Sequence, residues 1–284
     1  MRMNGKITRF ASMAACAAFL IAGTSACGTS ISVVTKGSAQ GPTITIGVAA
    51  DQPGLGYLHG GEYSGFDIDV AQYVAKTLGY AEKQIVFRQM APADRNPALA
   101  DGTVDMVVDS VAMGEAHDGE VAVAGPYLTV NEALLIRSDS AGKVSGLDDM
   151  SGKTACVVEG SAFADSVRDD ARHMTVSERG TYPQCVTALM IGEADAIITD
   201  DAIAMGLASN GRKGYLTSVT IPDNELSYGI AVKSGQNELV RQIGFALRAM
   251  VKDGSWQRAA DALNQTVGYV IDAKTNPPSI PSKQ

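Results

Sequence analysis

Acidic residues without nearby cations mark one stretch of the sequence as chemically unusual. No lysine or arginine occurs between Arg95 and Arg137, and the only other basic side chain there is His117. Carboxylates in a closed site could hold an amine through charge-assisted hydrogen bonds. Together with His117, Asp109 and Glu115 could instead support acid–base chemistry. The acids of the stretch are Asp101, Asp105, Asp109, Glu115, Asp118, Glu120 and Glu132.

No familiar catalytic or metal-binding spacing accompanies these acids. The three histidines are isolated, and the sequence has no nucleophile elbow, phosphate-binding loop or dinucleotide fingerprint. We therefore expect a protein that binds a ligand, with no metal ion, no cofactor and no catalysis. A solvated acidic loop would explain the same residues.

The segments that must position these residues alternate between strand-like and helix-like patterns. Strands that alternate with helices predict an α/β fold with mainly parallel sheets, and two such series predict two lobes. The predicted strands are residues 43–50, 84–90, 103–111, 132–138, 153–160, 194–200 and 225–233. The predicted helices are residues 68–79, 93–102, 161–171, 181–193, 201–211, 237–254 and 255–268.

Four predicted strand ends carry residues that could meet a ligand. Open α/β sheets bind ligands beyond the carboxyl ends of their strands. Those ends hold Asp51, the neighbours Asp109 and Ser110, Ser161, and Asp200. We expect the four loops to face one cleft between the lobes.

Composition indicates a globular protein rather than a nucleic-acid binder. The chain has 284 residues, of which 45% are hydrophobic, and this is enough for one large domain or two small ones with proper cores. Its formal net charge is −8, and no basic cluster forms the stripe typical of nucleic-acid binders. We expect a monomer that binds no nucleic acid.

The N-terminus has the pattern of an export signal. Arg2, Lys6 and Arg9 precede an apolar run that is too short for a comfortable membrane span, and small residues follow it. We expect a signal peptide over residues 1–26 and a flexible tether over residues 27–42.

Cys27 resembles the lipidated cysteine of bacterial lipoproteins, because Ser25 and Ala26 precede it. Thr24 departs from that pattern, in which an aliphatic residue is usual. The resemblance implies an exported protein anchored to the outer face of the cell membrane through an acylated Cys27. Cleavage after Ala26 by an ordinary signal peptidase is the competing interpretation.

Two further cysteines remain once Cys16 leaves with the signal and Cys27 takes the lipid. Cys156 and Cys185 form an even pair in an exported and therefore oxidising setting, which favours a disulfide. Two buried thiols are the alternative.

Eight short motifs resemble one protein family when they are taken in order. They span nearly all of the chain after the tether, and together they resemble the extracellular solute-binding proteins of family 3, the receptors of ABC importers for polar amino acids. The first motif and the two cysteines look most like the glutamate-binding lipoproteins of Gram-positive actinobacteria. The motifs are "DQPGLG", "GFDIDVAQYVAKTLG", "DRNPALADGTVDMVV", "VAGPY", "GKTACVVEGS", "ADAIITDDA", "SYGIAVKSG" and "MVKDGSW".

The resemblance implies a fold, a function and domain boundaries. The fold is the periplasmic-binding-protein type II fold, or Venus flytrap, in which two α/β lobes joined by two crossover strands close on a ligand. The function is capture of a small, glutamate-like amino acid for delivery to an ABC permease. Lobe 1 would comprise residues 43–131 and 229–270, lobe 2 residues 132–228, and residues 271–284 a flexible tail.

Three residues match family positions that contact the ligand. Asp200 matches the acid that binds the α-ammonium group, although Asp200 or Asp201 could simply cap the following helix, a role we expect for Asp201. Ser161 matches a hydroxyl residue that meets the ligand carboxylate, and it could equally be a plain helix cap. Arg95 matches an arginine that reaches a side-chain carboxylate in acidic amino-acid receptors, with a structural ion pair as the alternative.

Other matched residues are expected to be structural. Asp67 and Asp69 would serve the strand-to-helix turn and the helix N-terminus. Tyr127, Asn131 and Tyr228 would be hinge or packing residues near the crossover strands.

The α-carboxylate clamp of the family is altered at three positions. His117 falls where the family has an arginine, Ala112 falls on a hydroxyl position, and Asp109 occupies a usually small and uncharged position. The ligand-binding candidates are therefore Asp51, Arg95, Asp109, Ser110, His117, Ser161 and Asp200.

Several interpretations of the altered clamp remain open. The protein could bind an amino acid such as glutamate more weakly, or a different amine-bearing ligand whose cationic end meets Asp109 and Asp200. It could be a scaffold with a degenerate site, or the loop could be shifted so that Arg95 fills the space. An exported dehydratase of prephenate or arogenate, which some proteins of this fold are, is a further alternative.

Overall fold

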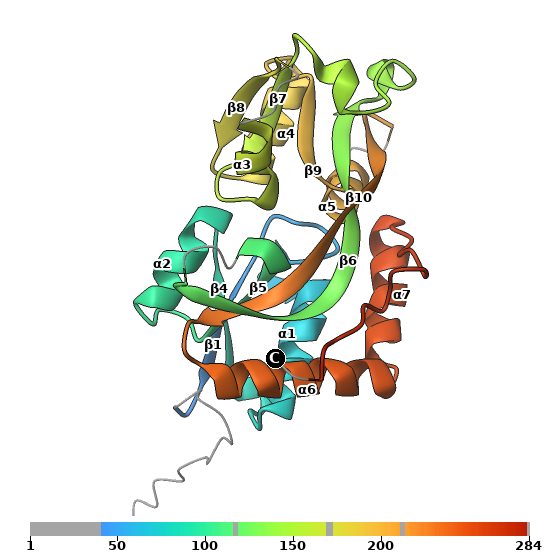
Figure 1. Ribbon diagram of the computed structural model, residues 1–284. Helices are drawn as coiled ribbons and strands as arrows, with labels where there is room; N and C mark the ends of the chain where they lie inside the picture. Colours follow the sequence, from blue (N-terminus) through green and yellow to red (C-terminus); the bar gives the residue numbers. More distant parts are fainter. Residues whose placement is uncertain (1–40, 116–118, 169–172, 211–213, 283–284) are drawn as a thin grey trace, which may run out of the picture. The chain divides into compact units, whose positions relative to one another are not determined.

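The computed structural model describes residues 41–115, 119–168, 173–210 and 214–282 (Figure 1). The expected signal peptide, Cys27 and the tether up to residue 40 lie outside this part of the chain, as does His117. Within the described residues, no helix is long and apolar enough to cross a membrane.

Lobe 1 is built on three parallel strands. β1 (Ile44–Val48) lies between β4 (Ile85–Gln89) and β5 (Met106–Ala112). A small antiparallel hairpin follows β1, formed by β2 (Tyr57–His59) and β3 (Glu62–Ser64). The helices of this lobe are α1 (Phe66–Thr77), α2 (Arg95–Ala100), α6 (Asn237–Lys252) and α7 (Ser255–Val267).

Lobe 2 repeats the arrangement with its own three parallel strands. β7 (Thr154–Val158) lies between β8 (Thr175–Arg179) and β9 (Ala196–Asp200). Its helices are α3 (Ala162–Arg168), α4 (Tyr182–Ile191) and α5 (Asp201–Ser209). Short 3-10 helices, in both lobes, are η1 (Glu82–Gln84), η2 (Pro92–Asp94), η3 (Met113–Glu115), η4 (Ser138–Ser140) and η5 (Leu147–Met150).

Two long antiparallel strands join the lobes. β6 (Val121–Arg137) and β10 (Leu216–Lys233) pair with each other along most of their length. β10 also pairs with β5 in lobe 1, and β6 also pairs with β9 in lobe 2. The strand order is therefore β4-β1-β5-β10-β6-β9-β7-β8, with the two crossover strands in the middle (Figure 1). This is the two-lobed α/β architecture that the sequence predicted.

A glycine fixes where α1 begins. Gly65 has a φ of 120°, and a Cβ at this position would lie 2.1 Å from the carbonyl oxygen of Leu55. No side chain fits there, so only glycine allows the helix to start against the loop that contains Leu55. Phe66 and Val70 then pack into the core, and Asp67 is buried beside them.

The predicted disulfide is present. Cys156 in β7 and Cys185 in α4 are bonded, with their Cα atoms 5.6 Å apart. Both residues are fully buried. The bond therefore ties α4 to the sheet of lobe 2.

Several elements differ from the sequence prediction. The strands predicted over residues 132–138 and 225–233 are parts of the longer β6 and β10. The sequence prediction missed the β2–β3 hairpin and β8, which are short and have no clear alternation of apolar and polar residues. Short strands of this kind gain their stability from partners that a local pattern does not show.

The C-terminal segment makes specific contacts that its composition did not indicate. The side chain of Asn276 accepts a hydrogen bond from the backbone N–H of Thr129 and donates one to the Thr129 carbonyl, each at 2.8 Å. Arg248 of α6 donates to the carbonyl of Pro281 at 2.6 Å. These contacts differ from the expectation of a flexible tail. The Asn276 side chain bonds to the backbone of β6 as a neighbouring strand would.

Candidate functional site

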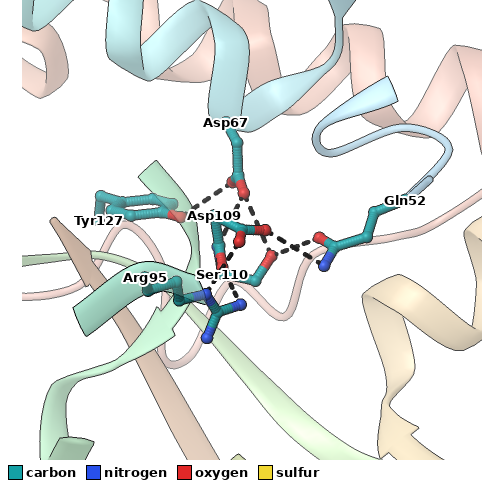
Figure 2. A network of polar contacts seen from close by, with 6 residues as sticks. All are labelled: Gln52, Asp67, Arg95, Asp109, Ser110 and Tyr127. Carbon is teal, nitrogen blue, oxygen red and sulfur yellow. Dashed lines mark hydrogen bonds and ion pairs between the residues drawn. The ribbon is translucent and has the colours of Figure 1, made fainter. Parts of the chain in front are cut away.

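Six buried residues form one network of polar contacts in lobe 1, here called the polar cluster (Figure 2). They come from the loop after β1, the first turn of α1, the start of α2, the end of β5 and the crossover strand β6. The exposed fraction of each is 6% or less. The polar cluster consists of Gln52, Asp67, Arg95, Asp109, Ser110 and Tyr127.

An ion pair lies at the centre of the polar cluster. Arg95 Nε donates to Asp109 Oδ2 at 2.9 Å, and Arg95 Nη2 donates to the backbone carbonyl of Asp109 at 2.5 Å. Burial raises the pKa of Asp109, and the Arg95 guanidinium opposes that rise. The structural ion pair that the sequence left open for Arg95 is therefore present, and it is buried.

Asp67 accepts three hydrogen bonds inside the polar cluster. Its carboxylate accepts from the backbone N–H of Ser110 at 3.0 Å, from the Ser110 hydroxyl at 3.1 Å and from the Tyr127 hydroxyl at 2.9 Å. Ser110 has a φ of 50°, an uncommon left-handed conformation. The Ser110 hydroxyl also lies 2.8 Å from Gln52 Oε1, and Gln52 Nε2 lies 3.5 Å from Asp109 Oδ1.

This network corrects the expectation that Asp67 serves only the start of α1. Asp67 does lie in the first turn of the helix, yet it is completely buried and linked to β5 and β6. Gln52 and Tyr127 are further members that sequence reasoning did not assign to the site. Two sequence signals could have indicated them: Gln52 directly follows a predicted site residue at a strand end, and Tyr127 lies within a family motif.

Asp51 links lobe 1 to lobe 2. Its Oδ2 accepts a hydrogen bond from the backbone N–H of Tyr182, the first residue of α4, at 3.1 Å. Burial raises the pKa of Asp51 to about 6, the Asp109 carboxylate adds to this rise, and the Tyr182 N–H opposes it. The Arg95 charge also acts on Asp51 and Tyr182, so the ion pair lies close to the boundary between the lobes.

Asp200 combines a helix cap with a buried charge. It is the last residue of β9, and its Oδ1 accepts from the backbone N–H of Ile203 at 2.9 Å, which caps α5. Burial raises the pKa of Asp200 to about 7, the Ile203 N–H opposes this rise, and Asp201 and Asp67 add to it. Asp200 therefore lies within electrostatic reach of the polar cluster.

The expectation that Asp201 caps this helix is wrong. Asp201 is the first residue of α5, and its Oδ1 instead accepts from the Tyr269 hydroxyl at 2.8 Å and from the backbone N–H of Asn131 at 3.2 Å. The extended backbone of Asp200 gives it the cap position, as is usual for N-cap residues. Asp201 therefore links α5 to β6 and to the segment after α7.

The hydroxyls of Tyr228 and Ser161 are buried and make no hydrogen bond among the described residues. The Tyr228 hydroxyl lies beside Asp200 and is completely buried, but the geometry falls short of a hydrogen bond. The hydroxyl of Ser161, which directly precedes α3, is also buried and without a partner. Buried hydroxyls are rarely left unsatisfied.

The loop that contains Ser161 lies against lobe 1. A Cβ at Gly160 would lie 2.6 Å from the Cα of Ala93, two residues before Arg95. The structure thus brings Asp51, Arg95, Asp109, Ser110 and Asp200 toward one region, and the Ser161 loop approaches it from lobe 2. Ala112 lies at the end of β5 and is buried.

Carboxylates outnumber cations in this region. Among the side chains that the structure describes, Arg95 is the only buried lysine, arginine or histidine. Burial raises the pKa of Asp67 to about 6, as it does for Asp51. No group of three or more acids, histidines or cysteines in the described chain is arranged to hold a metal ion. Carboxylates of this kind can hold an organic cation through charge-assisted hydrogen bonds.

A cavity of about 440 Å³ lies elsewhere in the described chain. It is bounded by the β2–β3 hairpin, α1 and α7, and none of the sequence-predicted site residues lines it. The region around the polar cluster is the better candidate site, because the buried charges of lobe 1 lie close there to Tyr182 and Asp200 of lobe 2.

Comparison with known proteins places the fold and this region in a family. Residues 44–263 match the model of the bacterial extracellular solute-binding proteins, family 3. The ABC transporter glutamine-binding protein GlnH of Bacillus subtilis is 33% identical over 216 residues, which cover 75% of this chain and 78% of that protein. The glutamate-binding protein GluB of Corynebacterium efficiens is 34% identical over 226 residues, 76% of each chain.

Solved structures agree with this assignment. An ancestral arginine-binding protein bound to glutamine superposes with a TM-score of 0.72 at 28% identity, covering 81% of this chain and 100% of that one. The ancestral amino-acid-binding protein AncCDT-1, a precursor of cyclohexadienyl dehydratase, shares the fold with a TM-score of 0.69 at 24% identity, covering 80% and 95%. The chain belongs to the bacterial extracellular solute-binding proteins, family 3.

Proposed function

We propose that this protein captures a small amine-bearing solute between its two lobes and delivers it to an ABC permease. Membership of the solute-binding family and the two-lobed fold support a receptor role. The relatives named for glutamine and glutamate support an amino acid or a related amine as the solute. The proposal includes no catalytic step.

The excess of buried carboxylates carries the proposal that the solute is cationic. The Asp109 charge acts on Asp51 and Asp67, and the Asp67 charge acts on Asp200. Arg95 is the only buried cation among the described side chains. An ammonium group would neutralise part of this charge, whereas an anion would add to it. Glutamate, which the family resemblance suggested, would bring two carboxylates to a site whose described cation is already paired.

The two free hydroxyls complete the proposed site. Tyr228 and Ser161 come from different parts of the chain, and each leaves a buried oxygen without a partner. In the proposed complex, Asp200 and the Tyr228 hydroxyl bind the ammonium group. The Ser161 hydroxyl binds a polar group at the other end of the solute.

We further propose that the protein is an exported monomer, held at the outer face of the membrane by a lipid on Cys27. The export pattern of residues 1–26 and the small residues before Cys27 support this proposal. A receptor tethered in this way would stay near the permease that it supplies.

A thermal-shift screen of the purified protein tests the proposed function. The screen would contain the twenty amino acids together with mono- and diamines. Amine-bearing solutes should raise the melting temperature with increasing concentration, and native mass spectrometry should show a one-to-one complex. If carboxylic acids that lack an amine stabilise the protein and no amine does so, the proposal is refuted.

A further inference from the structure

The cavity of about 440 Å³ beside the β2–β3 hairpin has the size of a small-molecule site. Pockets that hold organic ligands have volumes of about 300–1,000 Å³. Residues of α1 and α7 line this cavity, together with residues of the hairpin and of the end of α5. No member of the polar cluster lines it, so any ligand bound there would occupy a separate site.

Contacts between these elements fix the walls of the cavity. The Tyr57 hydroxyl accepts a hydrogen bond from Nδ2 of Asn210, at the end of α5, at 3.0 Å. The loop before the hairpin packs closely on α7, because a Cβ at Gly54 would lie 2.8 Å from Leu263 Cδ1. The cavity is therefore enclosed by packed elements, as is usual for sites that bind small molecules.

Apolar and aromatic side chains form much of the lining. Leu263 and Val267 of α7 are buried core residues at the edge of the cavity. Tyr57 of β2 and Tyr63 of β3 add partly buried rings from the hairpin. An apolar group gains free energy when it leaves water for such a surface, and aromatic rings also attract a cation over their faces.

Asp69 is the only acidic or basic residue among the described residues that line the cavity. Its carboxylate makes no hydrogen bond or ion pair within the described chain. The residue is exposed enough to be reached from solvent, yet the surrounding protein removes enough water to raise the pKa of its carboxyl. A ligand ammonium group would give this carboxylate the counter-charge that it lacks.

Gln72 adds a neutral polar group next to Asp69. It lies three positions further along α1, and residues at this spacing are neighbours on one helix face. Both side chains line the cavity. The amide oxygen of Gln72 can accept a hydrogen bond from an ammonium group whose other N–H groups point to Asp69.

We infer that this cavity is a second binding site, which takes a small arylalkylamine. Asp69 holds the ammonium group, and the aromatic body packs against α7 and the tyrosine rings of the hairpin. The inference goes beyond the proposed function, because the cavity shares none of the residues proposed to bind the solute between the lobes.

Calorimetric titration with 2-phenylethylamine at pH 7.5 tests the site in two variants. Asp69→Asn removes the charge, and Ala262→Trp fills the cavity from an exposed position of α7. Binding at the cavity should weaken at least about tenfold in Asp69→Asn, because a hydrogen bond to a charged group is lost. It should disappear in Ala262→Trp. A wild type that does not bind the amine, or either variant binding it as the wild type does, overturns the inference.

Matched substitutions at exposed positions of α7 outside the cavity are the controls. Asp261→Asn removes a charge and Gln265→Trp adds a ring, and neither residue lines the cavity. Both controls should bind 2-phenylethylamine as the wild type does, and equal losses in these controls count against the site. The alcohol 2-phenylethanol has the same shape without the charge. It should bind the wild type more weakly and should not distinguish Asp69→Asn from the wild type.

Asp200→Asn separates this site from the proposed site between the lobes. If the wild type binds two molecules of 2-phenylethylamine, Ala262→Trp should remove one and Asp200→Asn should weaken the other. Binding that depends on Asp200 alone would overturn the inference and support the proposed function. Binding that depends on Asp69 and Ala262, with no amine held between the lobes, would support the inference and refute the proposed function.

A second filling variant covers the case in which Ala262→Trp does not fold. Thr266 also lines the cavity and is exposed one turn further along α7. Thr266→Trp should abolish binding at the cavity, and circular dichroism of the ligand-free variant should match that of the wild type. A folded Thr266→Trp that keeps the wild-type affinity would contradict the inference.

Discussion

Asp200 and Asp67 each combine a local structural contact with a charge in the candidate site. Asp200 caps α5, and Asp67 lies in the first turn of α1 while it joins β5 to β6. A single substitution therefore changes stability and binding together unless the new side chain preserves the contact. Substitutions that separate the two effects are the informative ones.

Replacing Asp200 by asparagine or alanine separates its two roles. Asparagine caps helices about as well as aspartate, so Asp200→Asn should keep the stability of the ligand-free protein. Its affinity for the amine should fall about tenfold to a hundredfold, because a hydrogen bond to a charged group contributes about 1.5–3 kcal/mol. Asp200→Ala should also lose about 1 kcal/mol of stability with the cap. Denaturant titration and calorimetry measure these quantities, and unchanged amine affinity in Asp200→Asn would argue against contact with the solute.

The buried acids also predict how stability and binding depend on pH. Burial raises the pKa of Asp51 and Asp67 to about 6 and that of Asp200 to about 7, above the value of about 3.9 for aspartate in an unfolded chain. The folded protein therefore binds these protons more tightly. The stability that they contribute is complete below pH 4 and is lost as the pH rises through 6 to 7.

Melting temperatures and amine affinities between pH 5 and 8 test this linkage. The ligand-free protein should become less stable as the pH rises, while its affinity for an amine increases because more carboxylates are ionised. Asp200→Asn should lose less stability than the wild type as the pH approaches 7, because asparagine does not titrate. A wild type and an Asp200→Asn variant with the same pH profile would show that Asp200 does not titrate in this range.

At the scale of elements, patterns along the chain predicted most helices and strands but not their pairings. The apolar spacing of residues 68–79 indicated α1, and the run around Val107 indicated β5. The hydrogen bond between Asp51 and Tyr182 joins residues 131 positions apart, and no local period reveals such a contact. Asp200 caps α5, whereas its neighbour Asp201 does not. Both residues are aspartates, so the difference depends on the backbone geometry at the helix start.

The disulfide is an element-scale feature that cysteine counting did predict. It joins β7 to α4 across a sequence separation of 29 residues. In the chain-entropy model, a loop of this length contributes about 3–4 kcal/mol to stability. The double variant Cys156→Ala/Cys185→Ala should therefore unfold at a clearly lower urea concentration than the oxidised wild type. Reduced wild type is the control, and equal midpoints for all three would contradict a stabilising bond.

At the scale of the whole molecule, the two crossover strands hold the charged residues of both lobes in one region. β6 provides Tyr127 to the polar cluster and Asn131 to the contact with Asp201, while β10 provides Tyr228 beside Asp200. The tail adds Asn276 at Thr129, between Tyr127 and Asn131 on β6. The sequence analysis expected Tyr127, Asn131 and Tyr228 to be hinge or packing residues, and these contacts place them at the candidate site.

The central claim is that the protein recognises the positive end of its solute. Calorimetric titration with diamines and dicarboxylates of matched chain length, from three to six carbons, tests it most directly at pH 7.5. The two series differ in the sign of their end groups and little in size. At least one diamine should bind, and no dicarboxylate should do so. If no diamine binds, whether or not a dicarboxylate does, the account is contradicted.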